Sequence, residues 1–172
     1  MTIRRATAED AALLCSLAER TFVETFGHLY PPEDLAEYLA GAYPLELQHQ
    51  QLESGDYAAW LLEVEGEALG FAFAGPCGLP HADVQPGDGE LKRLYVLRAH
   101  QNGGSGGHLF AEALQWLESG GDRMLWIGVW SENLGAQRFY ARHGFEQVGT
   151  YEFPVGRVRD REFILRRSAQ KQ

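Results

Sequence analysis

Glycine is concentrated at one place in the sequence, where Gly103, Gly104, Gly106 and Gly107 make up four of five consecutive residues. Because glycine has no Cβ, backbone N–H groups in such a segment can point into one concavity without steric obstruction. Apolar residues follow at helical spacing over 109–117. The concavity is therefore expected at a helix N-terminus, where unpaired N–H groups and the macrodipole favour anions. This segment predicts the binding of a phosphate group.

Two common phosphate-binding motifs do not fit this segment. A P-loop needs Gly-Lys-Ser or Gly-Lys-Thr, and neither tripeptide occurs in the chain. The dinucleotide motif Gly-x-Gly-x-x-Gly fails at Leu109, and the acidic ribose partner is missing. What does fit is Gln-x-x-Gly-x-Gly over residues 101–106, between a strand and a helix. A nicotinamide-dependent enzyme is therefore disfavoured.

The elements on either side must position this loop. Residues 91–96 alternate as a strand does, and 124–130 is a run too apolar for an edge strand. Asn133 caps a helix that closes at 143–144. The other predicted elements are a strand at 2–5, a helix to about residue 22, helices starting at 32 and 44, a β-hairpin at 57–73, a surface loop at 75–89, and strands at 145–153 and 161–165. This order predicts an α+β domain with a mostly antiparallel sheet and one parallel crossover.

The composition is that of an ordinary globular protein, since 45% of the 172 residues are hydrophobic and 23% are charged. We expect a single domain over 1–172, because this length supports one sizeable core. No apolar run approaches the roughly 20 residues that span a bilayer, and the N-terminus lacks an apolar signal region, so we expect no membrane contact. Cys15 and Cys77 lie far apart without metal-like spacing. They favour reduced thiols in a cytoplasmic protein over a disulfide, and we predict no metal site.

The net charge of −9 is unevenly distributed. Residues 1–89 contain 15 acidic and 3 basic side chains, whereas residues 90–172 contain 9 acidic and 12 basic ones. An acidic chain disfavours a nucleic-acid partner. The asymmetry suits a C-terminal half that holds an anionic cofactor and an N-terminal half that meets a cationic substrate. Acids that only solvate helix surfaces give the same pattern, so this alternative stays open.

Two separated motifs give the chain a family resemblance. The first is the strand, loop and helix at 90–117, and the second is Asn-x-x-Ala-x-x-Phe-Tyr at 133–140, followed by Gly144-Phe145. In this order the two motifs resemble the GNAT (Gcn5-related N-acetyltransferase) family over essentially the whole chain. The segments ELKRLYV, IGVW and FY-x-x-x-GF look most like the PaiA-type spermidine/spermine acetyltransferases. The resemblance implies a mixed, mostly antiparallel sheet of six to seven strands, flanked by helices, with central strands that splay apart.

The resemblance also implies acetyl-CoA as co-substrate. In the family its diphosphate lies on loop amides, and its pantetheine arm pairs with the central strand like an added strand. The positions that match the loop are Gln101, Asn102, Gly103, Gly104, Ser105, Gly106 and Gly107; those that match the strand are Leu94, Tyr95 and Val96; and those on the second motif are Asn133, Ala136 and Phe139. Gln101 replaces a frequent arginine, so cofactor affinity leans more on backbone amides. For the three strand residues, the alternative to cofactor binding is a purely structural place in the sheet core. For Asn133, the alternative is a helix cap.

The resemblance to the family also implies catalytic roles for individual residues. Tyr140 matches the tyrosine that protonates the departing CoA thiolate, because a phenol with a pKa of about 10 can donate to a thiolate whose conjugate acid has a pKa of about 8.5. The alternative is a helix-face aromatic that packs beside its neighbours. The acceptor ammonium must lose a proton before attack, and Glu90 is the first candidate base, since it begins the central strand. A surface acid at a strand end is the alternative for Glu90, and Glu24 and His28 are further candidates.

The acceptor is expected to be a small-molecule amine, by preference a polycation such as spermidine or spermine. The residues predicted to bind it come from the acidic N-terminal half and are Glu24, Phe26, His28 and Glu33. Against this preference, the basic segment 156–161 could repel a polyamine. Protein N-terminal amines, an aminoglycoside-like antibiotic and an acetyl-CoA sensor without turnover remain alternatives. No cysteine is placed for an acyl-enzyme, so direct transfer in a ternary complex is expected; a homodimer stays open.

Overall fold

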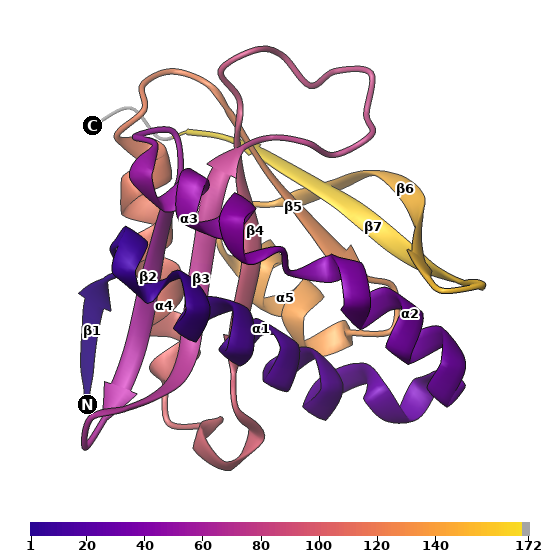
Figure 1. Ribbon diagram of the computed structural model, residues 1–172. Coiled ribbons are helices and arrows are strands. Elements are labelled where there is room, and N and C mark those ends of the chain that lie inside the picture. The colour runs from indigo at the N-terminus through magenta and orange to yellow at the C-terminus, as the bar shows by residue number, and fades with distance from the viewer. Residues whose placement is uncertain (170–172) are drawn as a thin grey trace.

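One sheet of seven strands organises the computed structural model, which describes residues 1–169 (Figure 1). The strands, in the spatial order β1-β2-β3-β4-β5-β7-β6, are β1 (Thr2–Arg5), β2 (Ala58–Val64), β3 (Glu67–Pro76), β4 (Gly89–Val96), β5 (Met124–Trp130), β7 (Val158–Ser168) and β6 (Glu146–Val155). Only β4 and β5 pair in parallel; all other neighbours within the described part are antiparallel. The predicted α+β class with one parallel crossover is confirmed.

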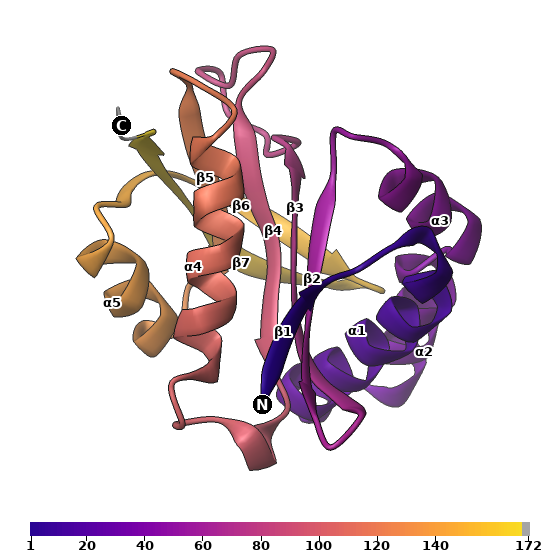
Figure 2. The same ribbon diagram turned by 90° about the vertical axis from the view of Figure 1, so that its left-hand side faces the viewer.

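Helices cover both faces of this sheet (Figure 2). They are α1 (Ala11–Phe26), α2 (Pro32–Ala42), α3 (Leu45–Glu53), α4 (Ser105–Glu118) and α5 (Leu134–Arg142), joined by the short turns η1 (Ala8–Asp10), η2 (Gly27–Leu29) and η3 (Arg98–His100). The apolar face of α4 packs with α5 on one side, around Leu109 and Phe110, while α1 packs Leu14 and Leu17 on the other. Among the described residues, no helix has the length and apolarity that crossing a bilayer requires.

A β-bulge at Lys92 changes the faces of the central strand. β4 pairs Leu91 with Ala74 and Arg93 with Phe73, so Lys92 is the extra residue. The bulge brings Leu91, Leu94 and Val96 to the face of α4, whereas strict alternation would have placed Leu91 opposite the other two. The side chains of Arg93 and Tyr95 point to the side of α1 instead. The unbroken alternation predicted over 91–96 is therefore wrong at Lys92.

The two central strands stay together over a short distance only. β4 and β5 pair at Gly89 with Leu125, at Glu90 with Trp126 and at Leu91 with Ile127, and beyond this point they diverge. β5 continues beside β7 as far as Trp130, so its other edge is open beyond Ile127. The strands thus form a V, as the expected splay requires, and the V leaves two strand edges without a partner strand.

Several predicted elements are too short, and two of them, α1 and β7, line a cleft between β4 and β5. α1 ends at Phe26 rather than near Phe22, because both rings lie on one helix face with their centroids 5.1 Å apart, and Phe22 packs on Tyr38 of α2. β7 begins at Val158, three residues before the predicted start, because it forms a two-residue turn with β6. The basic segment 156–161 is therefore mostly strand.

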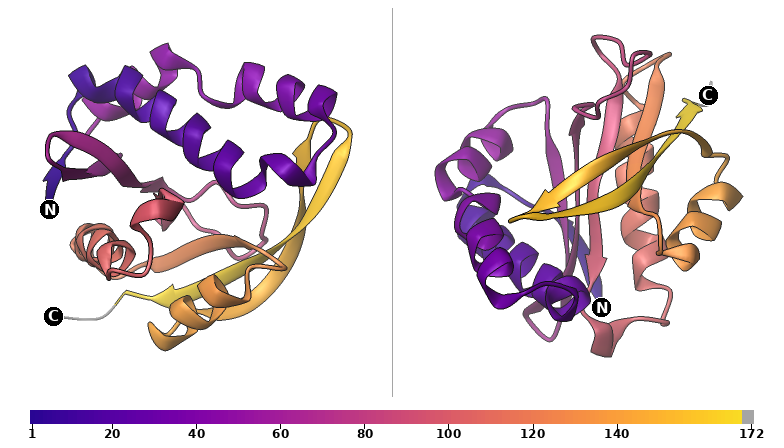
Figure 3. Two further views of the ribbon diagram at one scale, coloured as in Figure 1. Left: turned by 90° about the horizontal axis from the view of Figure 1, so that it is seen from below. Right: turned by 90° about the vertical axis from the view of Figure 1, so that its right-hand side faces the viewer.

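The β6–β7 turn fastens onto the first turn of α2, so the last hairpin reaches back to the N-terminal half (Figure 3). The backbone N–H of Arg157 donates to Asp34 Oδ1 at 2.8 Å, and Nε of the same arginine donates to this oxygen at 3.1 Å. Asp34 is buried, and a Cβ placed on Gly156 would come within 2.6 Å of its Cα. The hydrogen bonds to Asp34 hold the β6–β7 turn against α2, and the close approach leaves no room for a side chain at position 156.

We expect Gly156→Ala to lower the free energy of unfolding by about 2 kcal/mol, because the new methyl group meets the backbone of Asp34 and the residue has φ +57°. Gly66→Ala is the matched control: Gly66 has φ +83° in the β2–β3 turn but faces open space, so only about 1 kcal/mol of backbone strain is expected. Urea denaturation of both variants measures the difference. Equal losses would show that the Asp34 contact is not tight.

Candidate active site

A cleft of about 770 Å³ lies in the V between β4 and β5. It is lined from both faces of the sheet, and Gln101 at the start of the glycine-rich loop also lines it. The predicted site residues that line it are Phe26, Glu90, Leu94, Tyr95, Val96, Gln101, Asn133, Ala136 and Tyr140. The structure thus brings together both motifs and one residue of α1.

The glycine-rich loop leads into α4 as the sequence predicts. Gly104 is the N-cap of the helix with φ +81°, a conformation that glycine adopts without strain. A Cβ on Gly103, Gly104 or Gly107 would meet no other atom within 4 Å, so the backbone here is open to an approaching group. The first N–H groups of α4 lack helical partners, which suits a diphosphate. Ser105 is buried beside Met1 and can offer its backbone N–H.

The open edge of β4 offers backbone hydrogen bonds to a ligand in the V. Leu97 N–H donates to Leu69 of β3 at 2.9 Å, so by strand alternation the polar groups of Leu94 and Val96 face away from β3, into the gap. Gln101 confirms this direction, since its Nε2 donates to the Val96 carbonyl at 2.7 Å. An extended arm with amide groups can pair here as an added strand, so the edge fits the pantetheine of acetyl-CoA.

The second motif contributes one wall of the cleft. Asn133 caps α5, its Oδ1 accepting a hydrogen bond from the Ala136 N–H at 3.1 Å, and both residues line the cleft. Phe139 does not line it. Its ring packs edge-on against Phe110 at 5.0 Å in the core under α4. Phe139 thus supports its neighbour Tyr140 from the core, and its contact with the cofactor stays a prediction.

Tyr140 is a buried tyrosine whose side chain reaches the cleft. Its ring is held among Phe110, Phe139 and Phe145, with centroids 5.6 to 6.3 Å away. No hydrogen bond within the described residues engages its hydroxyl. Burial raises the pKa of the phenol, which therefore keeps its proton at neutral pH. A rigid, protonated hydroxyl at the wall of a cleft can donate a proton to a group bound beside it.

The opposite side of the cleft, toward α1 and α2, is aromatic and acidic. Asp160 and Glu162 lie two residues apart on β7 and share one face, and both line the cleft. Aromatic side chains surround them, and these are Phe22, Phe26, Tyr30, Tyr38, Trp130, Tyr151 and Phe153. Asp160 accepts a hydrogen bond from the hydroxyl of Tyr30. Carboxylates set among aromatic rings form a site for a cationic group.

The chain matches the model of the Acetyltransferase (GNAT) family over residues 16–145. It belongs to this family. Over 166 residues it is 26% identical to an uncharacterized N-acetyltransferase of Lactobacillus delbrueckii subsp. lactis, and the match covers 96% of each chain. It is an acetyl-CoA-dependent N-acetyltransferase of the GNAT type.

Solved structures agree in fold. The ribosomal-protein-alanine N-acetyltransferase from Brucella melitensis has a TM-score of 0.70 and 26% identity, over 97% of this chain and 99% of that chain. The PaiA N-acetyltransferase from Thermoplasma acidophilum, in complex with coenzyme A, has a TM-score of 0.71 and 18% identity, over 96% and 98%. At the latter identity the likeness shows the GNAT fold alone.

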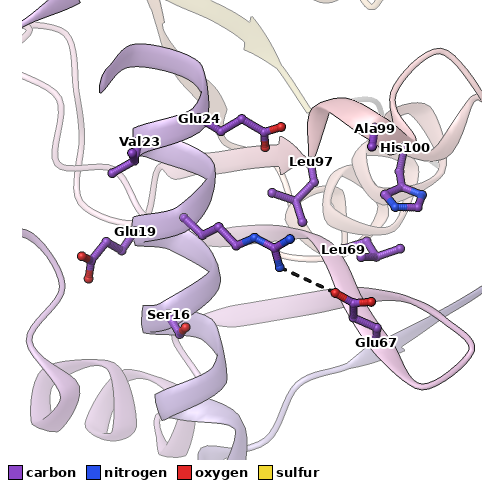
Figure 4. A pocket seen from close by; sticks show the side chains of 10 residues that line it. Ser16, Glu19, Val23, Glu24, Glu67, Leu69, Leu97, Ala99 and His100 are labelled. Atoms are coloured by element: carbon purple, nitrogen blue, oxygen red, sulfur yellow. Dashed lines mark ion pairs between the residues drawn. The ribbon is translucent and has the colours of Figure 1, made fainter. Parts of the chain in front are cut away.

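Three of the four predicted acceptor-binding residues of this GNAT chain lie outside the cleft. Glu24 is on the outer side of α1, where its Oε1 accepts the Arg98 N–H at 3.1 Å and its side chain lines a second pocket (Figure 4). His28 in η2 and Glu33 in α2 are exposed to solvent. Only Phe26 faces the cleft, edge-on to Trp130 at 5.5 Å. The structure thus gives Glu24 the task of tying α1 to the segment before the glycine-rich loop.

Glu90 lines the cleft but is already engaged. Lys92 Nζ and the Gly78 N–H both donate to its Oε1, each at 3.0 Å, and the residue is buried. It lies where β4 and β5 are still paired, at the closed end of the V. An acceptor ammonium could reach this carboxylate oxygen only by displacing Lys92 and the Gly78 N–H.

The loop 77–88 closes this end of the cleft, where Gly78, Leu79 and Pro80 line it. The predicted surface loop is anchored to the sheet at two points, His81 and Asp88. His81 Nε2 lies 3.1 Å from the Val148 carbonyl, while buried Asp88 accepts hydrogen bonds from the indole of Trp126 at 2.9 Å and from the Met124 N–H. The described residues contain no cluster of three or more side chains suited to a metal.

The sequence reasoning missed Asp160 and Glu162. The basic residues around them concealed the signal: Arg159 turns back to the Gly156 carbonyl at 2.9 Å, and Arg161 lies over Phe163 on the opposite face. Arg157 is paired with Asp34. The alternation of arginines with acids over 157–162 would have indicated one basic and one acidic face, had the strand been extended that far.

Proposed function

We propose that this GNAT enzyme acetylates a primary amine of a small polycation such as spermidine or spermine. The observation that carries the proposal is the acidic and aromatic side of the cleft, where Asp160 and Glu162 share one face of β7. Two residues along a strand span about 6.6 Å, a spacing that suits successive charged nitrogens of a flexible polyamine. Aromatic rings nearby attract cations and pack on the methylene segments between them.

The basic segment that argued against a polyamine does not oppose it. Its arginines lie on the face of β7 away from the cleft or are paired with Asp34. Cleft cations do exist on β4, but Lys92 is neutralised by Glu90, and the Arg93 guanidinium lies over the ring of Tyr43 at 4.9 Å. The acidic side of the cleft therefore supports a cationic acceptor.

The donor side follows from the residues that fit acetyl-CoA. The loop 101–107 would hold the diphosphate, and the edge of β4 at Leu94 and Val96 would hold the pantetheine. When bound, acetyl-CoA supplies a thioester whose acetyl carbon accepts the lone pair of the amine. A backbone N–H near Val96 would polarise the carbonyl, and Tyr140 would give a proton to the departing sulfur. The nitrogen would release its second proton to solvent, from which Tyr140 would be reprotonated. Overall, one ammonium group is converted into an amide, one thiol is formed and one proton is released.

Protein N-terminal amines are the second candidate acceptor, because the Brucella melitensis structure at 26% identity belongs to a ribosomal-protein-alanine N-acetyltransferase. A peptide amino terminus presents a single cation next to amide groups. It would therefore use only one of the two carboxylates on β7.

We expect spermidine to be acetylated with a KM at least about tenfold below that of n-octylamine, a monoamine of similar length, because the second carboxylate adds an ion pair. The measurement is release of free thiol at saturating acetyl-CoA, with an alanine-terminated peptide as the third substrate. Asp160→Asn should raise the KM for spermidine and leave the KM for n-octylamine within about twofold. Turnover of the peptide alone would contradict the polyamine assignment.

Two free thiols, Cys15 and Cys77, agree with the cytoplasm as the place of this reaction.

A further inference from the structure

Glu162 occupies the part of β7 that faces the V. In the sheet it lies between Trp130 of β5 and Tyr151 of β6, and its side chain lines the cleft. Its carboxylate makes no hydrogen bond or ion pair with any of residues 1–169, which distinguishes it from Glu90. An acidic side chain that is mostly buried, lines a substrate cleft and lacks a cation is costly to keep charged.

Burial and one charged neighbour favour the protonated form of Glu162. Burial raises the pKa of this carboxyl to about 7, and the negative charge of Asp160 adds to the effect. The titratable groups that face it come from five places around the cleft, and they are Tyr30 before α2, Tyr38 on α2, Tyr95 on β4, Tyr151 on β6 and Asp160 on β7. Burial raises the pKa of each of these tyrosines, and the charge of Glu162 raises it further, which places the carboxylate within electrostatic reach of four hydroxyls. The guanidinium of Arg93 on β4 lines the same cleft and acts on Tyr38 and Tyr95 in the opposite direction.

Tyr95 lies near both Glu162 and the proposed acid, Tyr140. The phenol of Tyr95 lies within electrostatic reach of both Glu162 and Tyr140. Tyr140 approaches the V from the face of α5, whereas Glu162 approaches from the face of α1 and α2. A proton acceptor and a proton donor thus lie on opposite sides of the open strand edges. This arrangement suits a reaction in which the amine attacks from one side and the thiolate departs on the other.

We propose that Glu162, rather than Glu90, is the general base that removes a proton from the ammonium group of the acceptor. The N–H bond breaks, an O–H bond forms on the Glu162 carboxylate, and the nitrogen keeps the electron pair with which it attacks the acetyl carbon. The proton then leaves the carboxyl group to solvent. A base with a pKa close to the working pH combines a useful charged fraction with a useful affinity for the proton. This assignment rests on the proposed function, acetylation of a primary amine that binds beside Asp160 and Glu162.

Direct titration of the carboxyl group tests the assignment without any acceptor. In protein labelled with carbon-13 at the glutamate carboxyls, NMR should show one resonance with its midpoint near pH 7, and this resonance should be missing from Glu162→Gln. A midpoint at the ordinary value of about 4.3 would overturn the proposal, because such a group has no advantage over any other surface acid.

Kinetics test the role itself. Glu162→Gln should lower kcat/KM for spermidine at pH 7 about 100-fold and remove the rise of activity between pH 6 and 8, with the Kd of acetyl-CoA unchanged. Glu90→Gln should keep that rise. Glu152→Gln, an exposed residue of β6, is the matched control for the change of charge and should keep the wild-type rate. Loss of the rise in Glu90→Gln, with its retention in Glu162→Gln, would return the role to Glu90.

Thermal unfolding separates loss of the base from loss of the fold. A carboxyl whose folded pKa is raised destabilises the protein as pH increases through that value, since the unfolded state releases its proton earlier. Glu162→Gln should therefore have a higher Tm than wild type at pH 8 and the same Tm at pH 4. If wild-type protein acetylates no amine, the proposed function fails while the NMR titration still decides whether Glu162 is the perturbed acid.

Discussion

Replacing Tyr140 by phenylalanine should lower kcat about 100-fold while the Kd for acetyl-CoA stays within about twofold. The ring keeps its contacts with Phe110, Phe139 and Phe145, so the wall of the cleft stays in place. What is lost is the hydroxyl proton, which burial retains on the oxygen by raising the pKa of the phenol. Steady-state kinetics with spermidine, together with calorimetric titration of acetyl-CoA, measure the two quantities separately.

Tyr57→Phe provides the matched control for this experiment. Tyr57 stacks on Phe73 at 5.7 Å, and it does not line the cleft. The same removal of one oxygen should leave kcat unchanged there. A kcat of Tyr140→Phe equal to that of Tyr57→Phe would remove Tyr140 from the proton-donor role, and water would then be the donor to the thiolate.

Asp88→Ala should lower the free energy of unfolding by about 3 kcal/mol. Asp88 is buried and accepts three hydrogen bonds, from the Trp126 indole at 2.9 Å, from the Met124 N–H at 3.2 Å and from the Gln85 N–H at 3.0 Å. Without the carboxylate, the fully buried indole N–H and the backbone N–H of β5 lose their acceptor. Urea denaturation followed by tryptophan fluorescence measures the loss.

The same loop contains the control for Asp88. Asp83 pairs with Arg166 at 3.0 Å, but its side chain is 62% exposed, so Asp83→Ala should cost less than about 1 kcal/mol. Because the loop lines the closed end of the cleft, Asp88→Ala should also raise the KM of the acceptor. Equal stability of the two variants would show that Asp88 is not the main anchor of the loop.

The parts of the fold that sequence reasoning predicted are those with strong local patterns. The glycine-rich loop before α4, the cap at Asn133 and the apolar run of β5 each depend on neighbours within a few residues. Both motifs point to the same family, and the family match confirms it. Their placement in one cleft follows from the crossover that connects β4 to β5.

The acceptor side was not predicted because it depends on contacts between distant segments. Asp160 meets Tyr30, which is 130 residues away in the sequence, and Glu24 meets Arg98, which is 74 residues away. Glu24 and Glu162 are both acids near aromatic residues in the sequence. The local pattern therefore does not show that Glu24 joins a helix to a loop whereas Glu162 faces the cleft. The β-bulge at Lys92 is a similar case, since it shifts the faces of β4 without a glycine to mark it.

The short junction between β4 and β5 has a consequence for the lifetime of the protein. Three residue pairs join the two halves of the sheet, and beyond them the edges lack a strand. A bound cofactor that pairs with these edges completes the sheet, so its free energy of binding adds to the resistance against unfolding, by about 2.7 kcal/mol at a free concentration 100 times its Kd. Proteases that act on the opened chain would then degrade the enzyme more slowly when acetyl-CoA is abundant, and the supply of the donor would set the amount of enzyme as well as its rate.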